Sequence, residues 1–207
     1  MLLVDAHQDL AWNILTFGRD YTLSAADTRQ HEQGALVPVQ NGDTLLGWPE
    51  YQKGQVALIF ATLFATPVRL SFGDWDTQTY ADPDQAHVRY SAQLDAYYRL
   101  VEENPDKFQL VGSQVDLETV LAPWKREDVE TPPVGLVPLM EGAEAVRHPV
   151  ELEMWWGRGV RIIGPAWAGT RFCAHEPRPP VISSASRSVF WFEVKASSSD
   201  HSTALIG

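Results

Sequence analysis

The stretch Leu2-Leu3-Val4-Asp5-Ala6-His7-Gln8-Asp9 decides how the rest of the chain is interpreted. Its apolar start predicts a β-strand, and it then places a histidine and an aspartate two residues apart. Because side chains alternate across a strand, His7 and Asp9 point to the same face, as does Asp5. An imidazole and a carboxylate that converge there are suitable ligands for Zn²⁺ or a similar divalent ion. The alternative is a capped strand end, with Asp9 closing a turn and His7 packed without a metal.

Three further apolar segments predict strands at residues 56–64, 135–141 and 160–163. Helices are expected between them, and strands that alternate with helices predict an α/β fold with a parallel sheet. Such sheets collect their ligands at the carboxyl ends of the strands. Glu141 stands where the third predicted strand meets its loop, so we expect its carboxylate near His7 and Asp9.

The helix expected over residues 82–104 begins with a capping signal, because Asp82 precedes Pro83 and Gln85 occupies the third helical position. Its apolar residues recur at spacings of three and four, which predicts one core-facing stripe. The stripe consists of Tyr90, Leu94, Tyr97, Tyr98 and Val101. Shorter helices are expected around residues 24–33, from Ser113, and from His148.

Composition limits the functional class. The chain has 207 residues and a formal net charge of −11, so it lacks the basic stripe that neutralises phosphates and nucleic acid is an unlikely partner. Cys173 is the single cysteine, which excludes an intrachain disulfide. Asp5 interrupts the N-terminus before a signal-peptide core forms, and no apolar run reaches the ~20 residues of a membrane span. The expectation is a cytoplasmic protein with no membrane partner.

Taken together, these motifs resemble the membrane (renal-type) dipeptidase family of zinc-dependent (β/α)₈-barrel hydrolases. The resemblance extends in order over about residues 1–172. The motifs that carry it are His7-x-Asp9 with Leu10-Ala11-Trp12, Glu141-Gly142, Gly159-Val160-Arg161-Ile162-Ile163, and Trp167-Ala168-Gly169-Thr170-Arg171.

The resemblance implies two zinc ions bridged by one glutamate and a hydroxide that attacks the peptide bond of a dipeptide. His7 and Asp9 would bind one ion, and Glu141 would bridge both. Zinc lowers the pKa of a bound water to around 7, which makes hydroxide available at neutral pH. Asp5 is expected behind His7, as a group that orients the imidazole.

The chain departs from the family at Trp167, which stands where the family has a histidine that polarises the substrate. Trp167 is therefore a candidate substrate contact. The remaining metal ligands of the family lie in the second half of its barrel, and residues 1–172 correspond to the first half. We expect a TIM-type barrel truncated to about four strands, with unpaired edges that favour a homo-oligomer.

Residues 173–207 differ in character from the rest. Eight serines lie between residues 183 and 202, against four in the preceding 182 residues. Two interpretations are an out-of-frame end of a longer coding sequence and a genuine serine-rich, disordered tail.

Three functions remain in competition. The first is a zinc-dependent dipeptidase. The second is a catalytically silent fragment of such an enzyme, and the third is a related amidohydrolase that acts on another small amide or lactone, which Trp167 favours. Of the other histidines, His31 is expected to be exposed, His87 to lie on the polar side of its helix, and His148 to cap one.

Overall fold

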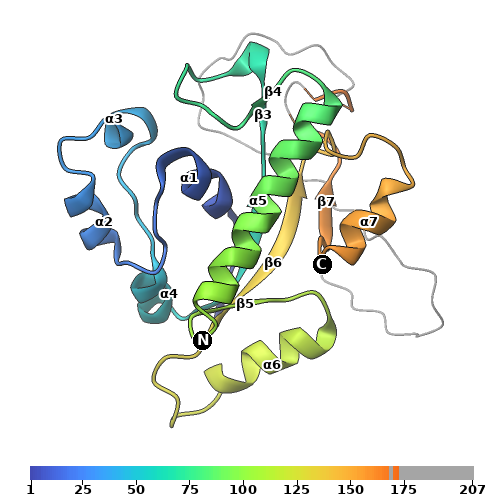
Figure 1. Ribbon diagram of the computed structural model, residues 1–207. Helices are drawn as coiled ribbons and strands as arrows, with labels where there is room; N and C mark the ends of the chain where they lie inside the picture. The colour runs from blue at the N-terminus through green and yellow to red at the C-terminus, as the bar shows by residue number, and fades with distance from the viewer. Residues whose placement is uncertain (168–169, 173–207) are drawn as a thin grey trace.

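The computed structural model describes residues 1–167 and 170–172, which form a parallel β-sheet with helices packed against it (Figure 1). The strands of this sheet are β1 (Leu3–Gln8), β2 (Val56–Leu63), β5 (Phe108–Leu110), β6 (Val134–Glu141) and β7 (Ile162–Gly164). Their order is β1-β2-β6, and β6 then pairs with β5 along its first half and with β7 along its second. Every pairing is parallel. The predicted α/β fold with a parallel sheet is confirmed, whereas closure into a barrel stays a prediction.

The long connection between β1 and β2 contains four short helices. They are α1 (Leu10–Phe17), α2 (Ala25–His31), α3 (Val37–Asn41) and α4 (Trp48–Gly54). The helix predicted around residues 24–33 is α2, and the Ser24 hydroxyl caps it by accepting a hydrogen bond from the Asp27 backbone N–H. The sequence analysis did not anticipate α3 and α4, because each is too short to show a helical period.

Helix α5 (Pro83–Glu103) is the longest described helix and lies across the sheet (Figure 1). Asp82 caps it as predicted, accepting a hydrogen bond from the Gln85 backbone N–H. Tyr90, Leu94 and Tyr97 are fully buried against the sheet. The predicted stripe was wrong at Tyr98, which is 39% exposed. Its ring lies beside the apolar stripe, and its hydroxyl donates to the Arg158 carbonyl oxygen at 2.6 Å.

Pro138 lies inside β6, a position from which proline is normally excluded because it cannot donate to a sheet ladder. The topology explains why it is tolerated: β5 pairs with β6 as far as Leu136, and β7 begins to pair at Leu139. Pro138 therefore stands where β6 changes partners. Arg161 enters this gap, donating its backbone N–H to the Pro138 carbonyl and its guanidinium to the Gly112 carbonyl. The Arg161 guanidinium also donates to the main-chain carbonyls of Trp156 and Val160.

The remaining elements are short. They are β3 (Thr66–Pro67), the 3₁₀ helix η1 (Val68–Leu70), β4 (Thr79–Tyr80), α6 (Gln114–Trp124) and α7 (Glu151–Gly157). The prediction that a helix begins at His148 was wrong: α7 begins at Glu151, and His148 contributes its carbonyl to the preceding turn. None of the described helices is long and apolar enough to span a membrane. The expectation for residues 173–207 falls outside the described residues.

Candidate metal centre

Two strand ends bring the predicted ligands together. His7 lies near the end of β1, Asp9 follows that strand, and Glu141 is the last residue of β6. These strands are not neighbours, because β2 lies between them. One nitrogen or oxygen atom from each of the three side chains lies within 4.8 Å of the others. Among the described residues, this is the only group of three or more such side chains that could hold a metal ion.

The distances in this cluster fit a shared ion better than direct hydrogen bonds. His7 Nε2 lies 3.4 Å from Asp9 Oδ1 and 3.4 Å from Glu141 Oε2. A good N–H···O hydrogen bond is about 2.7–3.2 Å long. Two atoms that each lie about 2.0–2.1 Å from a tetrahedral Zn²⁺ are themselves about 3.3–3.4 Å apart. The imidazole is thus spaced from each carboxylate as two ligands of one ion would be, and the two carboxylates lie within 4.8 Å of each other.

The surroundings of the Asp9 carboxylate are a second observation that favours a bound cation. Its Oδ1 atom is buried and has no hydrogen-bond partner among the described residues. A buried carboxylate oxygen without a partner is energetically costly, and a bound cation is one way to remove that cost. The donor set of one imidazole nitrogen and carboxylate oxygens suits Zn²⁺ and similar divalent ions. The residues present therefore fit the metal that the sequence analysis expected.

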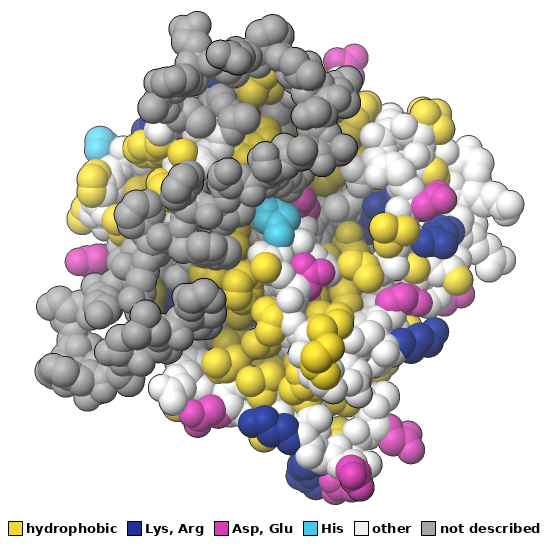
Figure 2. All heavy atoms as spheres, turned by 180° about the vertical axis from the view of Figure 1, so that it is seen from behind, with side chains coloured by type: hydrophobic (Ala, Val, Ile, Leu, Met, Phe, Trp, Pro, Cys, Tyr) yellow, Lys and Arg dark blue, Asp and Glu magenta, His cyan; other side chains and the backbone are white. Residues whose placement is uncertain are grey.

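The cluster is partly exposed to solvent. The side chains of His7, Asp9 and Glu141 are 25%, 29% and 11% exposed. Glu141 lies on the side of the sheet opposite α5, since its neighbour Met140 is buried in the core beneath α5, and His7 and Asp9 lie close to Glu141. Figure 2 shows this face of the molecule, on which hydrophobic side chains gather next to histidine and acidic groups.

Asp5 contacts His7 through the main chain. Its Oδ1 accepts a hydrogen bond from the His7 backbone N–H at 3.1 Å, and its Oδ2 accepts one from the Gln8 side chain at 2.6 Å. The carboxylate thereby fixes the backbone from which the imidazole projects. The predicted role of Asp5 in orienting the imidazole ring stays a prediction.

On the other face, two tyrosines of α5 form hydrogen bonds with main-chain groups at the ends of β2 and β6 and in α1. The Tyr97 hydroxyl donates to the Thr62 carbonyl at 2.8 Å and accepts from the Ala11 backbone N–H at 3.2 Å. The Tyr90 hydroxyl donates to the Glu141 carbonyl at 2.6 Å. Burial raises the pKa of both phenols well above the usual value, so they remain neutral donors. The helical spacing predicted these tyrosines only as core residues and did not indicate their hydrogen bonds at the ends of β2 and β6.

Trp167 lies on the same rim. Its Cβ stands 3.7 Å from the position that a Cβ on Gly142 would occupy, directly after Glu141. Its ring packs edge-to-face against Phe64, with 4.9 Å between the ring centroids. The structure thus brings Trp167 to the region of the predicted metal ligands, while its role as a substrate contact stays a prediction.

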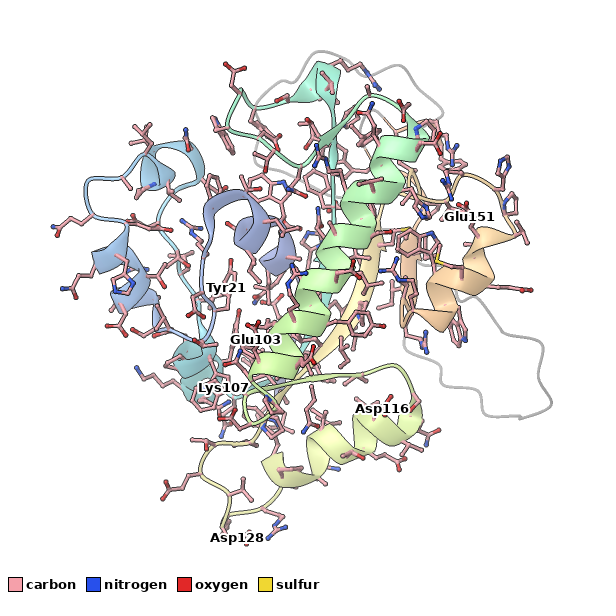
Figure 3. The ribbon with its side chains drawn as sticks, viewed as in Figure 1. Tyr21, Glu103, Lys107, Asp116, Asp128 and Glu151 are labelled. Carbon is pink, nitrogen blue, oxygen red and sulfur yellow. The ribbon has the colours of Figure 1, made fainter. Side chains whose placement is uncertain are left out.

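The other described histidines lie elsewhere. His31 and His148 are exposed, as expected for His31. His87 was expected on the polar side of α5, but it is half-buried: its Nδ1 lies 3.0 Å from the Ala145 carbonyl, and its ring packs against Trp155. Figure 3 places its ion-pair partner Glu151 at the start of α7, facing the first turns of α5.

The fold and this cluster together define a parallel α/β protein with a candidate metal site at the carboxyl ends of its strands. No protein-family model matches the sequence, and a search of curated proteins found no match. Solved structures do match, and the neighbours are M19 dipeptidase-family metallopeptidases. Because these structures are only 16–17% identical to the chain in sequence, the similarity establishes the fold alone.

Three of these structures are similar over most of the chain. The dipeptidase AC, described as a metallopeptidase of family M19, has a TM-score of 0.53 and 17% identity over 81% of this chain. The probable dipeptidase PvdM from Pseudomonas aeruginosa has a TM-score of 0.57 and 16% identity over 82%. A metallopeptidase from Rhodobacter sphaeroides, liganded with a phosphinate mimic of the dipeptide L-Ala-D-Ala, has a TM-score of 0.54 and 16% identity over 81%. The present chain spans 43%, 35% and 46% of their lengths.

Proposed function

We propose that this chain carries the first metal-binding half of the active site of a zinc-dependent dipeptidase. The observation that carries the proposal is the convergence of His7, Asp9 and Glu141 from two non-adjacent strands. The 3.4 Å distances from His7 Nε2 to the Asp9 and Glu141 carboxylates suit a tetrahedral ion, and the buried Asp9 Oδ1 has no hydrogen-bond partner among the described residues.

A divalent ion at this position would act as a Lewis acid and make water a nucleophile near neutral pH. His7 would donate its Nε2 lone pair as the neutral imidazole, and Asp9 would supply a negative charge on the same side. Glu141 has two carboxylate oxygens, so it can bind this ion through one and a second ion through the other. The binuclear arrangement therefore requires ligands in addition to these three residues.

The choice of substrate is supported by analogy with the structural neighbours. One of them was solved with a phosphinate mimic of a dipeptide. We infer a dipeptide as the substrate class and hydrolysis of its peptide bond as the reaction. Because the chain spans less than half of each neighbour, we assign metal binding to the described residues and turnover to the complete site.

A second candidate is a related hydrolase of another small amide or lactone. Trp167 favours it, because an indole stands where the resemblance places a substrate-polarising histidine. The indole N–H is only a donor and carries no titratable proton near neutral pH. Substrates with a carbonyl more reactive than that of a peptide need less polarisation.

The proposal is tested by zinc titration of the purified chain in a calorimeter, with metal content measured after dialysis. Wild-type chain should bind zinc, and His7→Ala and Glu141→Gln should weaken binding beyond the ~10- to 100-fold cost of losing groups behind a ligand. His148→Ala and Glu153→Gln are matched controls at exposed positions and should bind like wild type. A wild-type chain that binds no zinc, or variants that bind it equally well, would contradict the proposal.

Substrate class is tested separately, on zinc-loaded chain, with a panel of dipeptides, N-acyl amides and lactones. Turnover of dipeptides that disappears in His7→Ala supports the dipeptidase. Turnover confined to the amides or lactones supports the second candidate. Bound zinc without turnover of any compound indicates that the described residues bind the metal but do not complete the catalytic site.

A further inference from the structure

An aromatic pair, Phe64 and Trp167, lies beside the metal cluster on the same side of the sheet. Phe64 directly follows β2, whose last residue, Leu63, pairs with Met140. Phe64 therefore stands level with Glu141 on the neighbouring strand. Leu63 and Met140 are fully buried in the core beneath α5, so the alternation of side chains points Phe64 and Glu141 to the opposite side.

Trp167 extends this aromatic surface from the loop after β7. The two rings meet edge-to-face at an interplanar angle of 74°, which is a favoured aromatic geometry. Both side chains are partly exposed. The indole and the phenyl ring thus form a continuous apolar wall next to the carboxylate of Glu141.

The wall is held in place from behind by a buried amide. The Gln93 side chain on α5 is fully buried, accepts a hydrogen bond from the Phe64 backbone N–H and donates one to the Phe64 carbonyl. Thr170 fixes the other half, because its hydroxyl accepts from the Trp167 backbone N–H and donates to the Trp167 carbonyl. A surface that is already ordered loses little conformational entropy when a ligand binds to it.

We infer that the Phe64–Trp167 wall binds an apolar side chain of the substrate held at the metal cluster. The inference deepens the proposed function and rests on it. Phenyl and indole rings supply dispersion and apolar contact area but no charge to pair with a charged side chain. The neighbouring carboxylates of Asp9 and Glu141 also repel an acidic one. The substrate class is therefore dipeptides with a large aliphatic or aromatic side chain.

The test uses phosphinate dipeptide mimics in a calorimeter with zinc-loaded chain. One mimic carries two alanine side chains, and further mimics replace either alanine by phenylalanine, leucine or aspartate. A phenylalanine or leucine mimic should bind at least about 10-fold more tightly than the alanine mimic, as expected for one large apolar side chain removed from water. The aspartate mimics should bind more weakly than the alanine mimic.

Variants separate a binding wall from a merely structural one. Trp167→Ala and Phe64→Ala should reduce the apolar preference to below about 3-fold while the zinc affinity stays at the wild-type value, because neither side chain is a ligand. Trp167→Phe should retain most of the preference. Trp156→Ala is the matched control, since its half-buried indole stacks on Arg161 in another part of the fold, and it should leave the preference intact.

The outcomes distinguish this inference from the proposed function. If the chain binds zinc but binds the alanine and phenylalanine mimics with equal affinity, the proposed role of the Phe64–Trp167 wall is contradicted and the proposed metal site is not. An equal loss of affinity for every mimic in Trp167→Ala would also contradict the role of the wall, since that result indicates a structural role. Absence of zinc binding by the wild-type chain would overturn both.

Discussion

The two faces of the sheet differ in how far the polar atoms at the strand ends are satisfied by hydrogen bonds. On the α5 side, the Tyr97 and Tyr90 hydroxyls are buried and hydrogen-bonded to main-chain groups of Thr62, Ala11 and Glu141. On the other side, His7 Nε2 is 3.4 Å from each neighbouring carboxylate, and Asp9 Oδ1 is buried without a hydrogen-bond partner among the described residues.

This difference indicates that the α5 side of the sheet stabilises the fold and that the opposite side carries the candidate metal site. Satisfied hydrogen bonds on the α5 side stabilise the strand ends in one geometry. Like-charged carboxylates brought together on the other side destabilise the metal-free chain, and a cation reverses that cost. Changes on one face should therefore affect the stability of the metal-free chain, and changes on the other should affect its response to metal.

The largest effect is expected from zinc itself. At a free zinc concentration of about 100 times the dissociation constant, the free energy of unfolding should rise by about 2.7 kcal/mol. His7→Ala should abolish this increase while changing the stability in the presence of a chelator very little. Urea unfolding with and without zinc measures both quantities. If zinc stabilises His7→Ala as much as the wild-type chain, the assignment of metal binding to this face of the sheet is contradicted.

Tyr97→Phe tests the scaffold face. It should lower the free energy of unfolding by about 2 kcal/mol, because it leaves the Ala11 N–H and the Thr62 carbonyl buried without this partner. Zinc affinity should change by less than about 3-fold, because the Tyr97 hydroxyl approaches the ligand-bearing segment only at the Gln8 carbonyl, at a distance of 3.4 Å. Tyr98→Phe is the control, because its hydroxyl is in an exposed setting. A large loss of zinc affinity in Tyr97→Phe would argue against separate roles.

Tyr90→Phe should lower the free energy of unfolding less than Tyr97→Phe does, but it should also lower the zinc affinity. Its hydroxyl has the carbonyl of Glu141, a metal ligand, as its partner. Loss of the hydrogen bond to the Glu141 carbonyl should cost about 1 kcal/mol of unfolding free energy. It should also weaken zinc binding more than Tyr97→Phe does, because the backbone of Glu141 is released. Calorimetry on the two variants side by side measures the contrast.

The smallest effect concerns a surface ion pair that belongs to neither region. Arg147 lowers the pKa of Glu151 from 4.5 to about 2. Since the folded-state pKa is the lower one, this stabilisation is present above pH 4.5 and is lost as the pH falls towards 2. Glu151→Gln should remove it, reducing stability near pH 7 by less than about 1 kcal/mol. Glu153→Gln on the same helix should leave the acid limb of the stability curve unchanged.

Local pattern predicted much of the scaffold. The apolar runs at residues 56–64 and 135–141 became β2 and β6, and the Asp82 cap began α5 where expected. These features depend on neighbouring residues, so the sequence contains them directly. The fourth strand was predicted from residue 160 but begins at Ile162, because Pro138, which is level with Arg161 in the register of β6 and β7, has no N–H to donate to a sheet ladder.

Contacts between distant segments could not be read in the same way. The tyrosines of α5 looked like plain core, because a stripe at helical spacing does not reveal which carbonyl each hydroxyl will meet. In the sequence, Phe64 is the last residue of an apolar run and nothing marks it as a partner of Trp167. The packing of the two rings depends on two loops that follow different strands. A hydrogen bond or ring contact of this kind exists only once the strands are aligned.

By itself, the sequence determined the ligand types and the strand ends on which they stand, because residue chemistry and apolar runs are local properties. Only the tertiary structure decided that His7 and Glu141 approach within 3.4 Å across the intervening β2. Parallel register places their strand ends at one edge, and the helix packed behind them holds that register through buried tyrosine hydroxyls.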